Sequence, residues 1–207
     1  QTPKQNSINL AIDIQNCTFH MNNKNTIHHK AVEINIKKYS RVLYRGAVVI
    51  SNCTFSGHLG VDGAAVYIDT DSYISFKNSK FQITIRSVTF LNNFCEFMGC
   101  SIYFGNHIKA NISDVYFYFG PEFTSMDYKE IKGLFIASFG TITVHNSKFV
   151  YDNLYSSNTI SLLYLNILEK LDKTGNNKNI LYYVHTVCPQ WYHINVETTS
   201  NEEQEQF

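Results

Sequence analysis

One octapeptide pattern recurs along this 207-residue chain and constrains its fold more than any other feature. Each copy ends in phenylalanine, carries a small or apolar residue two positions earlier, and carries Asn, Asp or Ser three positions earlier. The copies are Ile12–Phe19, Val48–Phe55, Ile74–Phe81, Ile83–Phe90, Ala110–Phe117 and Ile142–Phe149. Recurrence of similar segments at intervals of roughly 20 to 50 residues is typical of repeat architectures.

Within each copy, apolar residues alternate with polar or variable ones until the alternation slips by one residue. Alternation with a period of two predicts a strand. Asn and Asp tolerate left-handed backbone angles, and the short side chains of Asn, Asp and Ser bond to nearby main chain. We therefore expect each strand to turn a corner there without changing the face it presents to the core. The expected corners are Asn16, Asn52, Asn78, Ser87, Asp114 and Asn146.

A second set of apolar segments follows these corners, and Gly63, Gly99 and Gly133 lead into the middle three. These segments are 31–34, 64–68, 101–104, 134–136 and 162–165. Short parallel strands stacked at about 4.8 Å would bury a continuous interior. We expect an all-β fold, a right-handed parallel β-helix (solenoid) of about five coils. Its interior would hold a column of Phe19, Phe55, Phe90, Phe117 and Phe149, beside a corner ladder that includes Asn16, Asn52 and Asn146.

The segment from Asn52-Cys53-Thr54-Phe55 to Ile68, with its echo at 87–104, resembles a known repeat. It is similar to the pectin-lyase-like right-handed parallel β-helix proteins, in particular to the NCTF and GGAIY repeats of polymorphic outer-membrane proteins and of large extracellular animal proteins. The resemblance covers roughly residues 9–166. It implies architecture more strongly than activity, because that family includes polysaccharide lyases, hydrolases, adhesins and stalks.

The last third of the chain changes character. We expect the β-helix to occupy residues 1–170, and residues 171–207 to form a terminal strand over 180–187 and a polar acidic tail. Residues 158–171 are consistent with a strand by alignment with the repeat, or with an amphipathic helix by the spacing of their apolar residues. We favour the strand.

Charge and sequons indicate the compartment. Lys and Arg number 17 and Asp and Glu number 17, which argues against a basic nucleic-acid-binding face. No apolar run reaches the roughly 18 to 20 residues that span a bilayer. Asn16, Asn52 and Asn111 begin N-glycosylation sequons, and the chain opens with Gln1, so we expect an extracellular, secreted protein. We expect Asn111 to be the most accessible of the three, because it lies at an outward strand position.

The five cysteines have different expected roles. Cys95 and Cys100 flank a short loop that a disulfide can close in an oxidising compartment. Cys17 and Cys53 occupy the same inward place in successive repeats and are expected to be buried thiols. Cys188 is left over, and we expect it to pair with another chain or domain.

Candidate metal and catalytic groups are sparse. Polysaccharide lyases of the resembled family hold Ca²⁺ with acidic residues from neighbouring coils, and Asp62, Asp69 and Asp71 form the best weak Ca²⁺ candidate here. The positions that match Asp69 in neighbouring coils are Lys37 and Gly105, so no carboxylate ladder builds up. The eight histidines are scattered without a metal-ligand spacing, and we expect them on the surface. We expect no catalytic residue, and no cofactor apart from a possible Ca²⁺.

The expected function follows from these observations. The first strand begins near Ile8 without a preceding cap helix, and an open coil end exposes strand edges. We therefore expect other subunits or further domains to stack on the coil ends of a non-catalytic structural or adhesion protein, a rod within a larger assembly or matrix. One alternative is a carbohydrate-binding module that stacks Tyr39, Tyr44, Tyr73 or Tyr118 on sugar rings. The other is a polysaccharide lyase or hydrolase.

Overall fold

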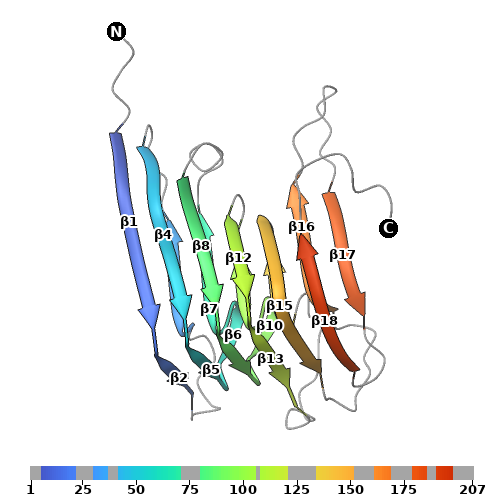
Figure 1. The fold of residues 1–207 in the computed structure, drawn as a ribbon. Coiled ribbons are helices and arrows are strands. Elements are labelled where there is room, and N and C mark those ends of the chain that lie inside the picture. Colours follow the sequence, from blue (N-terminus) through green and yellow to red (C-terminus); the bar gives the residue numbers. More distant parts are fainter. Residues whose placement is uncertain are drawn as a thin grey trace.

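The computed structural model describes residues 6–21, 30–36, 42–70, 80–105, 108–120, 134–151, 161–168, 179–185 and 190–197. Throughout these residues the regular elements are β-strands, and most of them pair in parallel (Figure 1). The chain is therefore all-β with parallel sheets. No helix long and apolar enough to cross a membrane occurs among them.

The long strands of successive repeats lie side by side. They are β1 (Asn6–Gln15), β4 (Val42–Ser51), β8 (Lys80–Arg86), β12 (Lys109–Ser113) and β15 (Thr141–Tyr151), paired in that order and all parallel. Their register aligns the octapeptides, because Ile12 pairs with Val48 and Val48 with Ile83. Equivalent positions of the repeat thus form rows across the sheet.

The first four long strands each end at a corner with left-handed backbone angles, and β15 continues through such a corner at Asn146. The φ values are 55° at Asn16, 52° at Asn52, 53° at Ser87, 56° at Asp114 and 47° at Asn146. The corners stay within the hydrogen-bond ladder, because Asn16 N donates to Ser51 O at 3.1 Å and Asn52 N donates to Arg86 O at 3.2 Å. The expected corner Asn78 lies outside the described residues. Asn92, with φ 50°, is a further corner that lies outside the octapeptide pattern.

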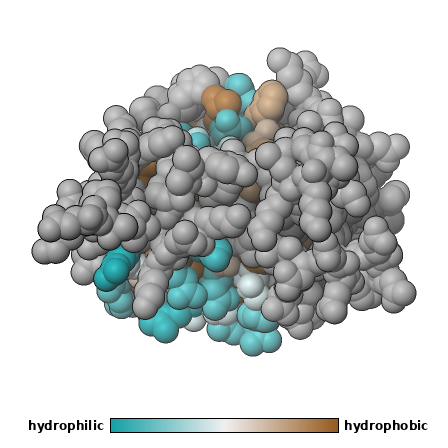
Figure 2. All heavy atoms as spheres, turned by 90° about the horizontal axis from the view of Figure 1, so that it is seen from above, coloured by the Kyte–Doolittle hydropathy of each residue, from teal (hydrophilic) through white to brown (hydrophobic). Residues whose placement is uncertain are grey.

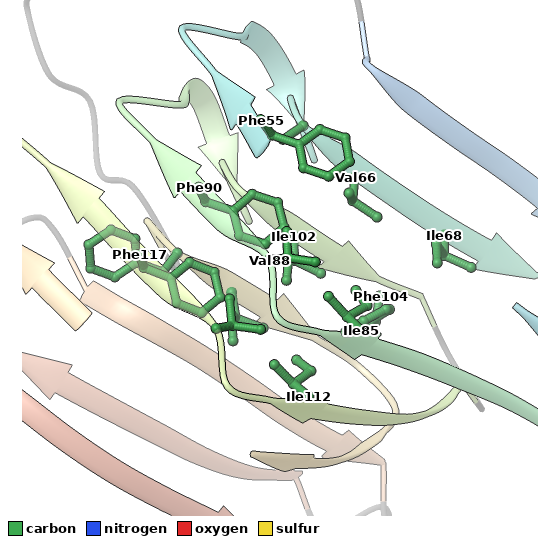
Figure 3. Close-up of a cluster of buried hydrophobic side chains, with 14 of the residues drawn as sticks. Phe55, Val66, Ile68, Ile85, Val88, Phe90, Ile102, Phe104, Ile112 and Phe117 are labelled. Atoms are coloured by element: carbon green, nitrogen blue, oxygen red, sulfur yellow. The ribbon is translucent and has the colours of Figure 1, made fainter. Parts of the chain in front are cut away.

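Beyond the corners, short strands carry the phenylalanines. The strands β2 (Thr18–His20), β5 (Thr54–Ser56), β9 (Thr89–Leu91) and β13 (Tyr116–Phe119) pair in parallel and join the second half of β15. The rings of Phe19, Phe55, Phe90, Phe117 and Phe149 stack at successive centroid distances of 4.7, 5.2, 5.1 and 4.7 Å. Figure 3 shows part of this column, whose last four rings are fully buried. Phe81 is outside the column, since it lies on β8 opposite Gly46.

A second parallel sheet closes the other side of the core. It contains β3 (Val32–Ile36), β7 (Val66–Thr70), β11 (Ile102–Phe104), β14 (Ile136–Ser138) and β16 (Ser161–Leu168). A two-stranded sheet of β6 (Leu59–Asp62) and β10 (Phe94–Met98) lies between the two along the chain. β16 falls within residues 158–171, so that segment is a strand and not a helix. Val66 and Ile68 of β7 belong to the same buried cluster as Ile85 of β8 and Ile112 of β12, in the core between the sheets (Figure 3).

Two antiparallel strands follow the parallel ones. β17 (Asn179–His185) pairs with β16, and β18 (Gln190–Glu197) pairs with β15. The sequence predicts the strand at 180–187, but it predicts only a polar tail after it, so β18 corrects that expectation. The signal was present, because Tyr192, Ile194 and Val196 alternate with a period of two. The polar residues between and after them obscured it.

Candidate functional site

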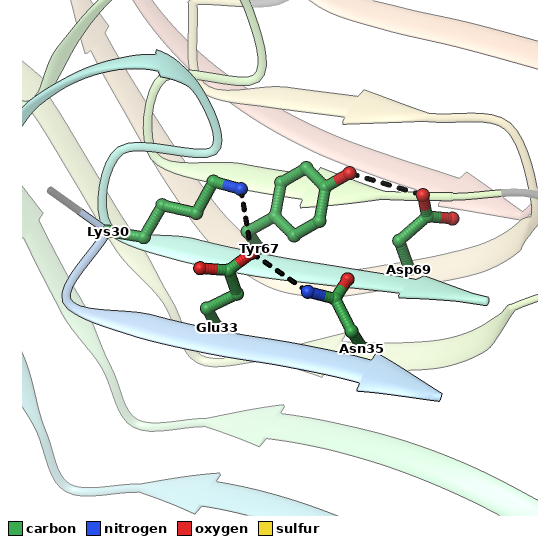
Figure 4. Close-up of polar contacts among 5 residues, drawn as sticks. All are labelled: Lys30, Glu33, Asn35, Tyr67 and Asp69. Atoms are coloured by element: carbon green, nitrogen blue, oxygen red, sulfur yellow. Dashed lines mark hydrogen bonds and ion pairs between the residues drawn. The ribbon is translucent and has the colours of Figure 1, made fainter. Parts of the chain in front are cut away.

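The outer face of the second sheet carries a row of large side chains in register. Glu33 pairs with Tyr67, and Tyr67 pairs with Tyr103, on neighbouring strands β3, β7 and β11. Val66 and Ile68 are buried while Tyr67 and Asp69 are half-buried, so alternate residues of β7 face the core and this outer row. Polar side chains gather around Tyr67 in this row. We call Lys30, Glu33, Asn35, Tyr67 and Asp69 the Tyr67 cluster (Figure 4).

Both faces of the Tyr67 ring are occupied. The Lys30 Nζ atom lies 3.4 Å from the ring centroid on one face, and the Tyr103 ring stacks on the ring at 4.7 Å and 4°. The first contact is a cation–π interaction, and the second is a parallel aromatic stack. A sugar ring needs a free aromatic face, so Tyr67 does not offer a stacking platform for carbohydrate.

The polar groups of the Tyr67 cluster bond to one another. Lys30 Nζ donates to Glu33 Oε1 at 3.1 Å, and Asn35 Nδ2 donates to the same oxygen at 2.8 Å. The Lys30 hydrogen bond is the main reason that the pKa of Glu33 lies below its ordinary value. The Glu33 side chain is 47% exposed, so solvent screening keeps the stabilisation by this ion pair small.

The weak Ca²⁺ candidate is divided by the structure. Asp69 uses both carboxylate oxygens, since Oδ2 accepts from Tyr67 Oη at 3.1 Å and Oδ1 accepts from Thr70 N at 2.7 Å. Asp62 is half-buried, with a buried Oδ1 that has no hydrogen-bond partner, and burial raises its pKa. Asp71 lies outside the described residues. Among the residues described, no three or more His, Cys, Asp or Glu side chains form a metal-binding group.

The register around Asp69 differs from the sequence expectation. On β3 the residue paired with Asp69 is Asn35, two residues before the expected Lys37. Gly105 does lie against Asp69, because a Cβ atom on Gly105 would overlap the Asp69 carboxylate. Burial raises the pKa of Tyr103 to about 12, and the charges of Asp69 and Asp62 add to the shift.

The three sequon asparagines are exposed in a different order from the one expected. Asn16 and Asn52 are exposed at their corners, whereas Asn111 is half-buried in β12 and its Oδ1 atom is buried without a hydrogen-bond partner. Asn111 does lie at an outward position, but Thr84 and Thr143 flank it on both neighbouring strands. A central sheet position is covered by its neighbours, while a corner projects away from them.

The cysteines separate into a linked pair and two thiols. The sulfur atoms of Cys95 and Cys100 lie at disulfide-bonding distance across the loop from β10 to β11. Cys53 is buried and Cys17 is half-buried, and each Sγ donates to a carbonyl oxygen two residues earlier, at 3.1 Å in both cases. Burial raises the pKa of the Cys53 thiol. Cys188 lies outside the described residues.

The tyrosines proposed as sugar platforms are mostly beyond what the structure describes. Tyr39 and Tyr73 lie outside the described residues, and only the backbone of Tyr44 is described, within β4. Tyr118 is half-buried, and its ring lies 6.5 Å from that of Tyr116.

Figure 2 shows hydrophilic described residues gathered along one margin of the face seen from above, and a few hydrophobic ones near the opposite margin.

His58 is a buried polar residue that the sequence predicts to be on the surface. The backbone N of His58 donates to Asn93 Oδ1 at 3.1 Å, and Asn93 Nδ2 donates to Phe55 O at 3.1 Å. The Nε2 atom of the His58 ring lies 3.2 Å from Phe19 O. Burial lowers the pKa of His58. His58 therefore contacts β2 through its ring and Asn93, next to β10, through its backbone.

Comparison of the chain with protein-family models, with curated proteins and with solved structures found no match in any of the three.

Proposed function

We propose that this chain is a right-handed parallel β-helix of about five coils and a non-catalytic structural or adhesion component of an extracellular assembly or matrix. The observation that carries the proposal is the in-register parallel pairing of the five repeats, with an unbroken stack of five phenylalanine rings. A stack in which each repeat buries the next is stiff along its length and presents extended outer faces for contact. Other subunits or further domains would bind its coil ends.

The described polar surface favours contact over chemistry. A catalytic acid or base must have hydrogen-bonding capacity directed at its substrate. Both carboxylate oxygens of Asp69 accept hydrogen bonds, from Tyr67 and from Thr70. One carboxylate oxygen of Glu33 accepts hydrogen bonds from Lys30 and Asn35. The Tyr67 cluster therefore acts as a cross-linked, preorganised outer face.

Two features support an extracellular location. The bonding distance between the Cys95 and Cys100 sulfurs fits a disulfide, and disulfides persist in oxidising compartments. The sequons at Asn16 and Asn52 are exposed where a glycan would project into solvent.

The experiment is non-reducing peptide mass mapping of the native protein, with and without enzymatic deglycosylation and after chemical cross-linking. We expect a glycan on Asn16 or Asn52, a Cys95–Cys100 link, a peptide from another protein joined to Cys188, and cross-links to extracellular proteins. Free thiols and unmodified sequons throughout would contradict the extracellular assignment. Release of unsaturated sugars from a polysaccharide, with or without added Ca²⁺, would contradict the non-catalytic assignment.

A further inference from the structure

The terminal strands at the two ends of the strand stack are paired differently. At one end β17 covers β16 and β18 covers β15, both in antiparallel pairing. At the other end, within the described residues, β1 pairs with β4 alone, and Figure 1 shows it at the margin of the sheet. The free side of β1, which we call the β1 edge, is therefore the side on which another strand can add.

The β1 edge lacks the features that keep strand edges from pairing. Edges are commonly protected by Lys, by Pro, by bulges or by short length. β1 has ten residues in continuous register with β4, contains no Lys, Arg or Pro, and carries one charged residue, Asp13. Such a strand is a template for further pairing.

The core beside the β1 edge is also incomplete. Phe19 is half-buried, whereas Phe55, the next ring in the stack, is fully buried. Ile12 and Ile14 are half-buried, whereas Val48 and Ile50, their register partners on β4, are fully buried. One more layer of strands would complete the burial of these side chains.

We propose that this layer is a second copy of the chain, whose β1 edge pairs antiparallel with the first about a two-fold axis. The inference rests on the proposed β-helix assembly and names the partner of its coil end. A register centred on Ala11 places position 14 opposite position 8 and position 12 opposite position 10, and the sequence has Ile or Leu at all four. It also places Asp13 opposite Asn9, and no like charges are opposed.

The covered opposite end determines the type of assembly. Head-to-tail stacking would place β1 of one copy on β15 of the next, but β18 already occupies that position. The β1 edge therefore cannot add to β15, whereas it can pair with a second β1 edge, and a two-fold contact of that kind closes after two copies. The assembly is therefore a dimer and not a filament.

The area is close to the lower limit for a specific dimer. Ten residues of β1 at about 3.4 Å each give an edge of about 34 Å, five residues of β3 give about 17 Å, and each sheet contributes a width of about 10 Å. The footprint is then roughly 500 Å² per copy and roughly 1,000 Å² in total, about the minimum for a specific interface. We expect dissociation in the micromolar range.

The test is sedimentation velocity of the full chain from about 1 to 100 µM, with Ala11→Lys and Ala11→Glu as variants. Ala11 is exposed, so neither side chain disturbs the core. Each variant opposes like charges across the axis and is expected to be monomeric, while an equimolar mixture of the two is expected to recover the dimer. Gln82→Lys is the matched control, because Ala11, Ala47 and Gln82 share one row of the sheet and Gln82 lies two strands from the edge. It is expected to stay dimeric.

A second measurement does not depend on charge. Under oxidation Ala11→Cys is expected to form a disulfide between two copies at residue 11, identified by peptide mapping, whereas Gln82→Cys is not. A native chain that stays monomeric at about 100 µM, a dimer that survives both charge variants, or filaments would each overturn the inference. These results leave the peptide mapping of glycans and native disulfides unaffected, so failure of the dimer and failure of the extracellular function are distinguishable.

Discussion

The corner residues show how single side chains direct this fold. Asn16, Asn52, Ser87, Asp114 and Asn146 all have φ between 47° and 56°, and each stands three positions before a phenylalanine of the repeat. These corners could be predicted because their requirement is local, a left-handed backbone angle that short polar side chains tolerate. Asn92 has the same angle, but its Oδ1 accepts from Gly120 N at 2.8 Å. That role depends on a residue 28 positions away and could not be predicted from the pattern.

Ser87 offers the cleanest test of the corner, because it belongs to no sequon and is exposed. Ser87→Val introduces a β-branched side chain at φ 53° and is expected to lower the free energy of unfolding by about 1–2 kcal/mol. Ser87→Gly has no Cβ and is expected to match the native chain or exceed it. Urea denaturation measures both. The control Thr84→Val, at a half-buried strand position on β8, is expected to stay within about 0.5 kcal/mol, and equal stability of the two Ser87 variants would contradict the prediction.

At the scale of strands, the placement of polar side chains depends on contacts between residues that are distant in the sequence. His58 joins Phe19 and Asn93, which lie 39 and 35 residues from it, so no local pattern indicates that it is buried. The Tyr67 cluster has the same origin, because it depends on the pairing of β3 with β7. The repeats predict that these strands are neighbours. They do not determine register across loops of unequal length, and the expected partner of Asp69 was wrong by two residues for that reason.

The His58 contact predicts an acid-sensitive junction between β2 and β5. Burial lowers the pKa of folded His58 below its ordinary value of 6.5, and the nearby His20 adds to the effect. The unfolded chain therefore binds the proton more readily, so the free energy of unfolding is highest above pH 6.5. It falls as the pH drops from about 6.5 toward the lowered pKa, by at most about 1.4 kcal/mol per pH unit.

The measurement is urea denaturation from pH 8 to 5 for the native chain and for His58→Gln. Glutamine does not titrate and retains an amide donor for Phe19 O. We expect the stability advantage of the native chain over the variant to shrink with falling pH below about 6.5 and to stay constant above it. A difference that is independent of pH over this range would show that His58 is not held neutral by burial.

At the scale of the whole molecule, repetition and termination are encoded differently. The phenylalanine column and the parallel order of strands follow from a pattern that recurs six times, and the structure stacks the phenylalanine rings of five of those copies. The end of the strand stack is specified by a single segment that does not recur in the sequence. β18 reverses direction to pair with β15, and neither its partner nor its direction is specified by the octapeptide. A sequence pattern can therefore indicate how such a stack continues more readily than how it stops.

The covering role of β18 makes a prediction about the size of the assembly. His193→Pro combined with Ile194→Pro places prolines at two successive positions opposite β15, one of which must direct its N–H toward that strand. Loss of β18 pairing would expose the edge of β15 from Thr143 to Tyr151, onto which the β1 edge of another copy can add in parallel. A heterologous contact of this kind does not close, so the variant is expected to form open-ended filaments in addition to dimers. Electron microscopy and light scattering distinguish the two. The same double substitution at Glu202 and Glu203, beyond the end of β18, is expected to leave the native assembly unchanged. Dimers without any filaments in the β18 variant would show that the pairing of β18 with β15 is not what limits growth.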